Sequence, residues 1–412
     1  MLKPLDVFAP GKIPLKKTNV YAVRGTKEDD FREAVERSLV PIVYGEYGVG
    51  KTSLARHNFK EKDAAGLLVN IESVAGKSFQ DICDRILEKL QYTVTHRVVD
   101  TQTDQTAHEQ SGGAEIIQPW GKASIGSRRT RSRSNASQKE RELVIKSPTD
   151  SKLVEECEKK GVVLLLDELH RASPAFGEDL SRFIKTYGNY SCDKFKIALL
   201  GTASDATKLV RMDKGIDRLL QEVHLLSMDE DESRYLVEEG MRSLLISISE
   251  PQVKKLIKVS VGSPSILQYL CLEVSQAAFK RTPRIVDNSD IESAVRKFVE
   301  TKEARLNKAY ISAVETTGGS QYRKQILFAM SECEDEFVTM DYLSAKVTEY
   351  LGRPTPSTSL SGPLRDLKGE KYGRVLSDVE RPDSEQRMYN YSTFTDPSLK
   401  AFIRMQKRRG EV

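Results

Sequence analysis

The feature that most constrains this chain is a glycine-rich octapeptide, Gly45-Glu46-Tyr47-Gly48-Val49-Gly50-Lys51-Thr52, which matches the pattern GxxxxGK[ST]. It stands between a short apolar stretch and a helical pattern, so it forms the turn from a strand into a helix. Glycines let successive backbone N–H groups point at a phosphate, and the helix N-terminus adds positive potential. We therefore expect residues 45–52 and Ser53 to bind ATP, with Lys51 on the β and γ phosphates and Thr52 on magnesium.

An acidic pair follows the most apolar run of the chain. Residues 162–166 are all Val or Leu, and Asp167 and Glu168 come directly after them. Such a run predicts a strand buried on both faces. Asp167 can hold the magnesium through water, and Glu168 can polarise a water for in-line attack on the γ phosphate. A strand that merely ends in solvated acids is the alternative, but the octapeptide upstream favours ATP hydrolysis.

Two further residues are candidates for catalysis because of their position. Thr202 follows the apolar run at 196–200, where its hydroxyl can orient the attacking water, although a Thr at a strand end is often a helix cap. Arg218 lies between that strand and the helical region beyond it, where it can act as an arginine finger on the nucleotide of a neighbouring subunit. A solvated surface Arg is the alternative, and Arg211 is the second candidate for the finger.

The order of elements predicts an α/β fold with a parallel sheet. Short apolar stretches at 42–44, 66–71, 162–166 and 196–200 alternate with helical patterns. The run 92–147 interrupts this alternation with Thr, Gln, Ser and Arg, and we interpret it as a disordered basic insertion. Without it, Lys51 and Asp167 are separated by about the 50 to 60 residues that two helices, two strands and their loops need.

The second half of the chain is helical and then changes character. Residues 228–314 show only helical patterns, which predicts a helical lid. Residues 315–412 give helices at 322–330, 341–351 and 360–367, strand-like runs at 373–379 and 388–394, and a closing helix, so a winged helix-turn-helix is expected. The predicted domains are a leader at 1–25, an ATPase core at 26–227, the lid and this winged helix domain.

Composition excludes several classes of function. The net charge of +4 is too small to imply a polyanion partner by itself. The longest apolar run is far short of a membrane span, and the N-terminal sequence has no apolar region like that of a signal peptide, so a cytoplasmic protein without membrane contact is expected. The five cysteines are scattered and form no CxxC pair, which predicts buried thiols rather than disulfides or a zinc site.

Taken together, these motifs resemble an AAA+ ATPase, and within that class the branch of origin-recognition and replication-initiator ATPases and the related STAND signalling ATPases. The resemblance rests on GEYGVGKT, LLLDELH, LLGTA, the helical lid and the C-terminal winged helix, and covers nearly the whole chain except 92–147. It implies that the leader packs near the adenine, so that Val20, Tyr21 and Arg24 contact the nucleotide. The sequence GSPS at 262–265 resembles the lid motif of STAND proteins, which gives Pro264 a nucleotide-binding role.

Two positions depart from this resemblance. Initiators carry a sensor Arg in the lid helix, where this chain reads SPSILQYL, and STAND proteins use a winged-helix His to contact ADP, whereas all histidines here lie at or before His224. His170 follows the acidic pair and can couple the γ phosphate to a neighbour, or it can be a hydrogen-bonded structural residue.

The interpretation of the partner stays open between two classes. Arg365, Lys368, Lys371 and Arg374, with Lys407, Arg408 and Arg409 of the tail, can bind DNA phosphates, but a winged helix that docks a protein is the equal alternative. The insertion adds Arg128, Arg129, Arg131 and Arg133 as a phosphate-binding arm or a solubilising loop.

We expect an ATP- and Mg²⁺-dependent homo-oligomeric switch that assembles on duplex DNA or on a partner. The alternative is a STAND-like signalling ATPase that controls a separate effector protein in a phage-defence or toxin operon.

Overall fold

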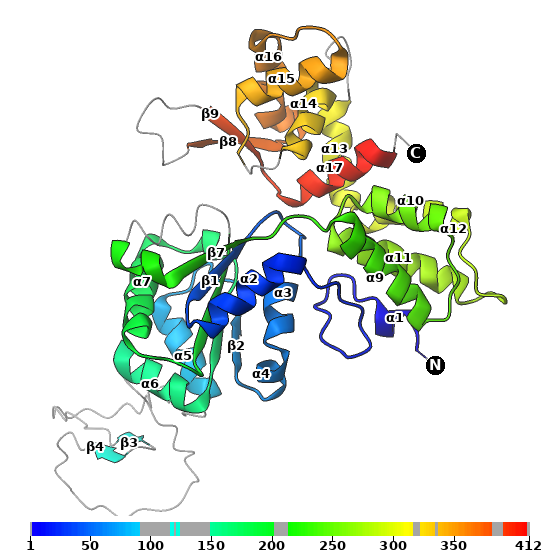
Figure 1. Cartoon of the computed structure of the whole chain (residues 1–412). Coiled ribbons are helices and arrows are strands. Elements are labelled where there is room, and N and C mark those ends of the chain that lie inside the picture. The colour runs from blue at the N-terminus through cyan, green and yellow to red at the C-terminus, as the bar shows by residue number, and fades with distance from the viewer. Residues whose placement is uncertain are drawn as a thin grey trace, which may run out of the picture. The chain divides into compact units, whose positions relative to one another are not determined.

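The computed structural model describes residues 2–90, 116–118, 121–123, 149–201, 213–315, 322–333, 337–380 and 390–409 (Figure 1). The chain divides into two units. The sheet unit contains residues 29–44 and 58–223, and the P-loop unit contains residues 1–28, 45–57 and 224–412. The glycine-rich octapeptide therefore belongs with the helical second half of the chain, although it follows a strand of the sheet directly.

A five-stranded sheet in the order β2-β5-β6-β1-β7 forms the centre of the sheet unit. The pairs β2/β5, β5/β6 and β1/β6 are parallel, with Leu166 opposite Ile71 and Leu199. The inner strands are apolar because both of their faces are covered, and β5 is completely buried. The α/β fold with a parallel P-loop sheet is thus confirmed. The strands are β1 (Val40–Tyr44), β2 (Leu68–Ile71), β5 (Val163–Leu166), β6 (Lys196–Gly201) and β7 (Leu220–His224).

Helices pack against this sheet around an aromatic cluster. Phe183 lies 5.2 Å from Phe79 and 6.3 Å from Phe195 between ring centroids, and all three rings are buried. The large apolar area of such rings stabilises the contact between helices and sheet. The helices of this part of the chain are α2 (Gly25–Glu36), α3 (Lys51–Asn58), α4 (Lys60–Ala64), α5 (Phe79–Lys89), α6 (Asp150–Lys160) and α7 (Pro174–Asn189), with short 3-10 turns η1 (Leu169–Arg171) and η2 (Lys214–Leu219). Of these, α3 belongs to the P-loop unit.

The predicted helical stretch at 228–314 is confirmed. Its helices begin with side-chain caps, such as Asp229 before α9 and Ser263 before α11, whose oxygens accept backbone N–H groups of the first turn. The elements are α9 (Glu230–Ser243), α10 (Glu250–Ser260), α11 (Pro264–Ala278), α12 (Asn288–Lys297), the π-helical turn η3 (Phe298–Lys302) and α13 (Ala304–Val314).

The C-terminal segment has the predicted order of three helices, a hairpin and a final helix. The hairpin strands pair antiparallel, with Leu376 opposite Phe394, and Ser392 also bridges to Val338 ahead of the second helix of the segment. Figure 1 shows the hairpin extending beside the helices. The elements are α14 (Tyr322–Glu332), α15 (Met340–Leu351), α16 (Ser357–Lys368), the turn η4 (Glu370–Tyr372), β8 (Leu376–Glu380), β9 (Asn390–Phe394) and α17 (Ser398–Arg409).

The leader begins with a short helix and an apolar pair. The helix α1 (Pro4–Val7) places Val7 and Phe8 in the apolar core of the P-loop unit, where both are fully buried. A Cβ on Gly240 of α9 would lie 2.3 Å from the Phe8 ring, so only the absence of a side chain at Gly240 leaves room for this ring. Tertiary packing therefore holds the start of the leader.

The insertion lies mostly outside the described residues, and so do its four arginines. Two pieces of it are described, β3 (Ile116–Gln118) and β4 (Gly121–Ala123), which pair antiparallel. Disorder of the insertion stays a prediction.

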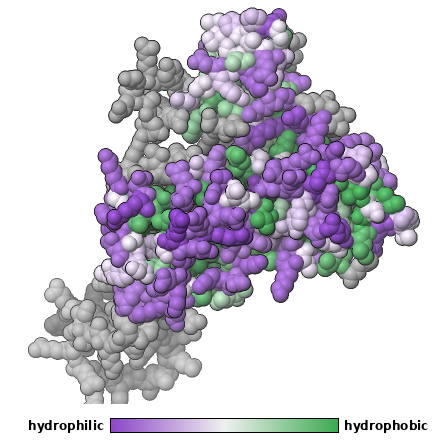
Figure 2. Space-filling view, viewed as in Figure 1, coloured by the Kyte–Doolittle hydropathy of each residue, from purple (hydrophilic) through white to green (hydrophobic). Residues whose placement is uncertain are grey.

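The five cysteines are free and buried, as expected. Burial raises the pKa of Cys83 to about 12, so this thiol stays protonated at neutral pH. On the face drawn in Figure 2 hydrophilic residues predominate, and hydrophobic residues form separate groups. In the described part of the chain, no helix combines the length and the apolar character needed to cross a membrane.

Candidate nucleotide site

The octapeptide has the backbone conformation that its glycines predict. Gly45, Gly48 and Gly50 all have positive φ, and Gly45 at +154° allows the closest approach. A Cβ on Gly45 would lie 2.1 Å from the backbone oxygen of Leu225, which comes just after β7. Only glycine fits there, because any side chain would overlap a carbonyl group that cannot move alone. The first turn of the loop is therefore fixed by a segment far away in the sequence.

Lys51 lies at the first position of α3 and folds back over the loop. Its Nζ donates to the carbonyl oxygens of Gly45 and Glu46, at 2.8 and 3.0 Å. The helix begins here, because the N–H of Leu54 donates to the oxygen of Gly50 at 2.9 Å. The ammonium group thus lies beside the helix N-terminus, and both features favour an anion at this position.

The N-terminus of a second helix lies against the same loop. A Cβ on Gly48 would be 3.6 Å from Ser263 Oγ, and one on Gly50 would be 3.7 Å from Pro264 Cγ. Ser263 caps α11, and Pro264 is its first residue. The structure therefore brings the predicted Pro264 next to the loop.

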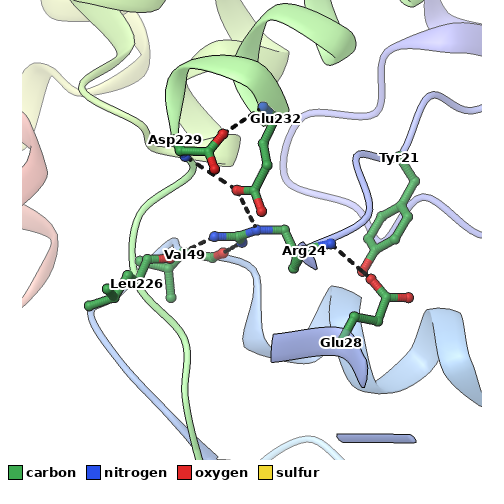
Figure 3. A network of polar contacts seen from close by, with 7 residues as sticks. All are labelled: Tyr21, Arg24, Glu28, Val49, Leu226, Asp229 and Glu232. Carbon is green, nitrogen blue, oxygen red and sulfur yellow. Dashed lines mark hydrogen bonds and ion pairs between the residues drawn. The ribbon is translucent and has the colours of Figure 1, made fainter. Parts of the chain in front are cut away.

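Arg24 is the centre of a buried polar network that supports the loop (Figure 3). Its Nη1 donates to the carbonyl of Val49 at 2.6 Å, Nη2 to the carbonyl of Leu226 at 2.7 Å, and Nε to the carboxylate of Glu232 at 3.0 Å. Glu232 also accepts the N–H of Asp229, which caps α9. The guanidinium, 6% exposed, therefore joins the octapeptide to the start of α9. These bonds give Arg24 a supporting role that the sequence did not predict.

Tyr21 is likewise held by protein groups. Its ring stacks on His57 of α3 with 3.9 Å between centroids and 13° between planes. Its hydroxyl donates to the carboxylate of Glu28 at 2.9 Å, and the same carboxylate accepts the N–H of Arg24. Val20 is buried, and its carbonyl accepts from the Gln268 amide. The leader therefore lies beside α3 and α11, while direct contacts of Val20 and Tyr21 with a nucleotide stay a prediction.

The side chain of Glu46 has partners that sequence reasoning missed. Both of its oxygens accept from Arg404 of α17, at 2.8 and 2.6 Å, and Lys400 Nζ lies 2.8 Å from the same carboxylate. Burial raises the pKa of the Glu46 carboxyl, but the hydrogen bonds and charges of Arg404 and Lys400 outweigh this and hold the pKa below its ordinary value. No local signal identifies this contact, because the partners are 358 positions apart. The other loop side chains differ in exposure: Tyr47 is 62% exposed and Val49 is buried.

The acidic pair lies in the sheet unit at the end of β5. The N–H of Asp167 donates to Ile71 of β2 at 2.9 Å, and its carboxylate accepts the N–H of Glu168 at 2.7 Å. Glu168 has φ +55°, a left-handed conformation that is strained for a non-glycine residue, and its carboxylate lies 3.0 Å from Arg171. Strained residues of this kind often occur at functional sites.

The remaining predicted catalytic residues are only partly described. Thr202 and Arg211 lie outside the described residues. Thr202 follows directly after Gly201, the last residue of β6. Arg218 is exposed in η2, so it stays a candidate for contact with another subunit. His170 lies in η1.

The cations predicted to bind DNA fall into two groups. Lys368 forms an ion pair with Asp378, and Arg374 lies 3.4 Å from Glu370. Arg365 and Lys371 are exposed, and the Lys371 ammonium lies over the Tyr372 ring. In the tail, Lys407 pairs with Glu332, whereas the side chain of Arg409 lies outside the described part. Neighbouring carboxylates thus offset part of the charge that the sequence assigned to this surface.

Each unit contains oxygen donors of the kind that magnesium prefers. Thr52 and Ser53 place two hydroxyl groups in the first turn of α3, and the carboxylate of Asp167 follows β5 in the sheet unit. The described residues contain no cluster of three or more His, Cys, Asp or Glu that would form a protein cage for a metal. Magnesium bound to ATP needs few protein ligands, because phosphate and water oxygens complete its shell.

One part of the chain matches a known protein family. Residues 35–210 match the model of the AAA domain. Among solved structures, the Walker-type ATPase PABY2304 of Pyrococcus abyssi is 15% identical, with 96% of this chain and 98% of that chain covered and a TM-score of 0.49. Cdc6p from Pyrobaculum aerophilum is 13% identical, with 99% and 98% covered and a TM-score of 0.46.

The Aeropyrum pernix ORC1 protein, solved in complex with DNA, is 13% identical, with 98% of this chain and 97% of that chain covered and a TM-score of 0.43. No curated protein matches the chain at a significant level. The predicted AAA+ character is confirmed by the family match, which contains the octapeptide, the acidic pair and the strands that carry them. Residues 35–210, which carry the octapeptide and the acidic pair, are therefore similar to the AAA domain.

Proposed function

We propose that this protein binds and hydrolyses ATP with magnesium and acts as a nucleotide-controlled switch. The observation that carries the proposal is the octapeptide: three glycines with positive φ, Lys51 folded over the loop, and the N-terminus of α3 directly behind it. This combination concentrates N–H donors and positive charge at one point, as a triphosphate requires.

Each residue of the site then has one task. The N–H groups of 46–51 bind phosphate oxygens, and Lys51 moves from the carbonyls of its own loop to the β and γ phosphates. Thr52 and Asp167 would hold the metal, which would neutralise charge on the phosphates. Glu168 orients the attacking water and accepts its proton, with Thr202 as a second orienting group.

Arg218 supplies positive charge to the site of a neighbouring subunit, which makes the active form a homo-oligomer. The switch rests on the lid contact, because the start of α11 lies against Gly48 and Gly50 and therefore responds to what the loop binds.

Two substitutions test the ATPase. Lys51→Ala should abolish measurable ATP binding in calorimetry, because it removes the charge that the phosphates need. Glu168→Gln should bind ATP normally but lose turnover by about a hundredfold or more, because an amide cannot accept the proton. Lys60→Ala and Glu88→Gln remove the same groups from exposed surface helices and should change neither property. Equal turnover in the wild type and Glu168→Gln would refute the catalytic assignment.

The switch has two candidate partners. Exposed Arg365 and Lys371 support assembly on duplex DNA, whereas the ion pairs of Lys368, Arg374 and Lys407 favour docking of a protein, as in a STAND-like ATPase that controls a separate effector. Light scattering with ADP, ATP and ATP plus duplex DNA separates the two. Assembly that needs DNA and weakens steeply with salt supports the first, and assembly with ATP alone that is insensitive to DNA supports the second.

A further inference from the structure

The ion-pair cluster at Glu46 lies at a position where the P-loop pattern GxxxxGK[ST] accepts any residue. It consists of Glu46 in the loop and Lys400 and Arg404 on α17, and we call it the Glu46 clamp. Arg404 is fully engaged: both Nη atoms bind Glu46, and Nε donates to the carbonyl of Ser331 at the end of α14. The clamp therefore fastens the loop to two helices of the C-terminal segment.

The clamp is shielded from water. The side chains of Glu46, Arg404 and Lys400 are only 21%, 17% and 10% exposed. Paired charges in such a setting are screened less than surface pairs, and a bidentate Arg–carboxylate pair fixes direction as well as distance. Removal of one partner leaves a largely buried charge without its counterpart, which lowers the free energy of unfolding. The clamp therefore holds the loop more firmly than an ordinary surface ion pair would.

The same residue is also held from the other side. The carbonyl of Glu46 accepts from Lys51 Nζ at 3.0 Å, so the backbone of Glu46 binds the lysine that the phosphates need, while its side chain binds α17. A shift of this peptide changes both contacts at once. Phosphates that draw Lys51 away from the carbonyl thus act on a residue that α17 holds.

We propose that Lys400 and Arg404 are positioning residues for the nucleotide site, acting through Glu46, and that this contact couples nucleotide binding to the C-terminal segment. The proposal rests on the proposed nucleotide function. The clamp keeps the loop in the conformation in which Gly45, Gly48 and Gly50 have positive φ. Loss of the clamp therefore weakens nucleotide binding, although neither cation needs to contact the phosphates. Through the same contact, nucleotide binding at the loop affects α17 of the C-terminal segment.

A double-mutant cycle on the full chain tests this. Glu46→Gln and Arg404→Gln should each weaken ADP binding about tenfold in calorimetry, and the double variant should be no weaker than the poorer single one. Arg404→Lys should recover part of the loss, because it restores the charge but not the bidentate contact. Lys346→Gln is the matched control: it removes a paired cation from α15 of the same C-terminal segment, whose partner there is Glu349, and should leave the affinity within twofold.

Hydrogen exchange distinguishes this coupling from a purely structural role, which would not make the protection of α17 depend on ADP. In the wild type, ADP should change the protection of α17 amides, and in Glu46→Gln it should not. Affinities within twofold of the wild type, or losses that multiply in the double variant, would overturn the proposal.

Failure of the wild type to bind any nucleotide would refute the proposed function instead. The clamp is then still tested without nucleotide: Arg404→Gln should accelerate hydrogen exchange of the backbone amides at 46–50 at least fivefold relative to Lys346→Gln. Equal rates would contradict it.

Discussion

The P-loop and the acidic strand end are both parts of the predicted ATPase, but they are held in different ways. The octapeptide is fixed by groups from remote segments: the carbonyl of Leu225, the guanidinium of Arg24 and the side chain of Arg404. The acidic pair is fixed within its own sheet, through Ile71 of the adjacent strand and Arg171 three residues onward.

This difference shows where each region is vulnerable. A loop that depends on distant contacts can respond to changes in the helices that supply them, which suits the sensing part of a switch. Because the strand before the acidic pair is fully buried, we expect the position of the pair to depend less on distant segments. Substitutions that remove remote supports should therefore affect the P-loop strongly, and substitutions beside the acids should have small effects.

Loss of Arg24 should have the largest effect. Arg24→Met keeps the length of the side chain but leaves Glu232 without its charged partner and the carbonyls of Val49 and Leu226 without the guanidinium donor. Removal of one partner from a buried ion pair costs about 3 to 5 kcal/mol in the free energy of unfolding. Urea unfolding of the variant and the wild type measures this loss in the free energy of unfolding. Arg32→Met, which removes a half-exposed Arg paired with Asp29 in the sheet unit, should cost no more than about 0.5 kcal/mol. Similar losses for both variants would contradict the comparison.

A pair of glycine substitutions should give the next largest difference. Gly45→Ala places a methyl group on the carbonyl of Leu225, so we expect a loss of about 3 kcal/mol or more, together with loss of ATP binding. Gly66→Ala in the sheet unit also imposes a positive φ, +71°, but its Cβ would meet nothing within 4 Å. It should cost only about 1 to 2 kcal/mol, the strain of a left-handed alanine. Thermal unfolding of the two variants separates the clash from the strain, and equal costs would mean that the close approach to Leu225 is not decisive.

The smallest effect is expected beside the acidic pair. Arg171→Ala removes an exposed ion pair with Glu168, which contributes at most about 0.5 kcal/mol to stability. ATP affinity should stay unchanged, because Arg171 supports no part of the loop. Denaturant unfolding and calorimetry check both points. A large loss of affinity would show that the acidic pair is not the independent region described here.

The sequence predicted much of this arrangement because the relevant patterns are short. The strands β1, β2, β5 and β6 and most helices were found from apolar runs and caps, and the octapeptide was recognised from its spacing alone. Strand β7 was missed because it is a polar, partly exposed edge strand with a single buried residue, Val223. The roles of Tyr21 and Arg24 were predicted only as nucleotide contacts, since their partners Glu28, Val49 and Glu232 could not be read from the adjacent residues.

By itself, the sequence determined which residue types the loop and the strand end carry, and these types indicate phosphate binding at the loop, because the glycines and the lysine lie within eight residues. Only the tertiary structure decided what holds the loop in place. Glu46 pairs with Arg404, and Arg24 pairs with Glu232, because the leader, α9 and the C-terminal helices share the apolar core of the P-loop unit. Contacts between segments so far apart depend on the packing of whole helices, and no local pattern records them.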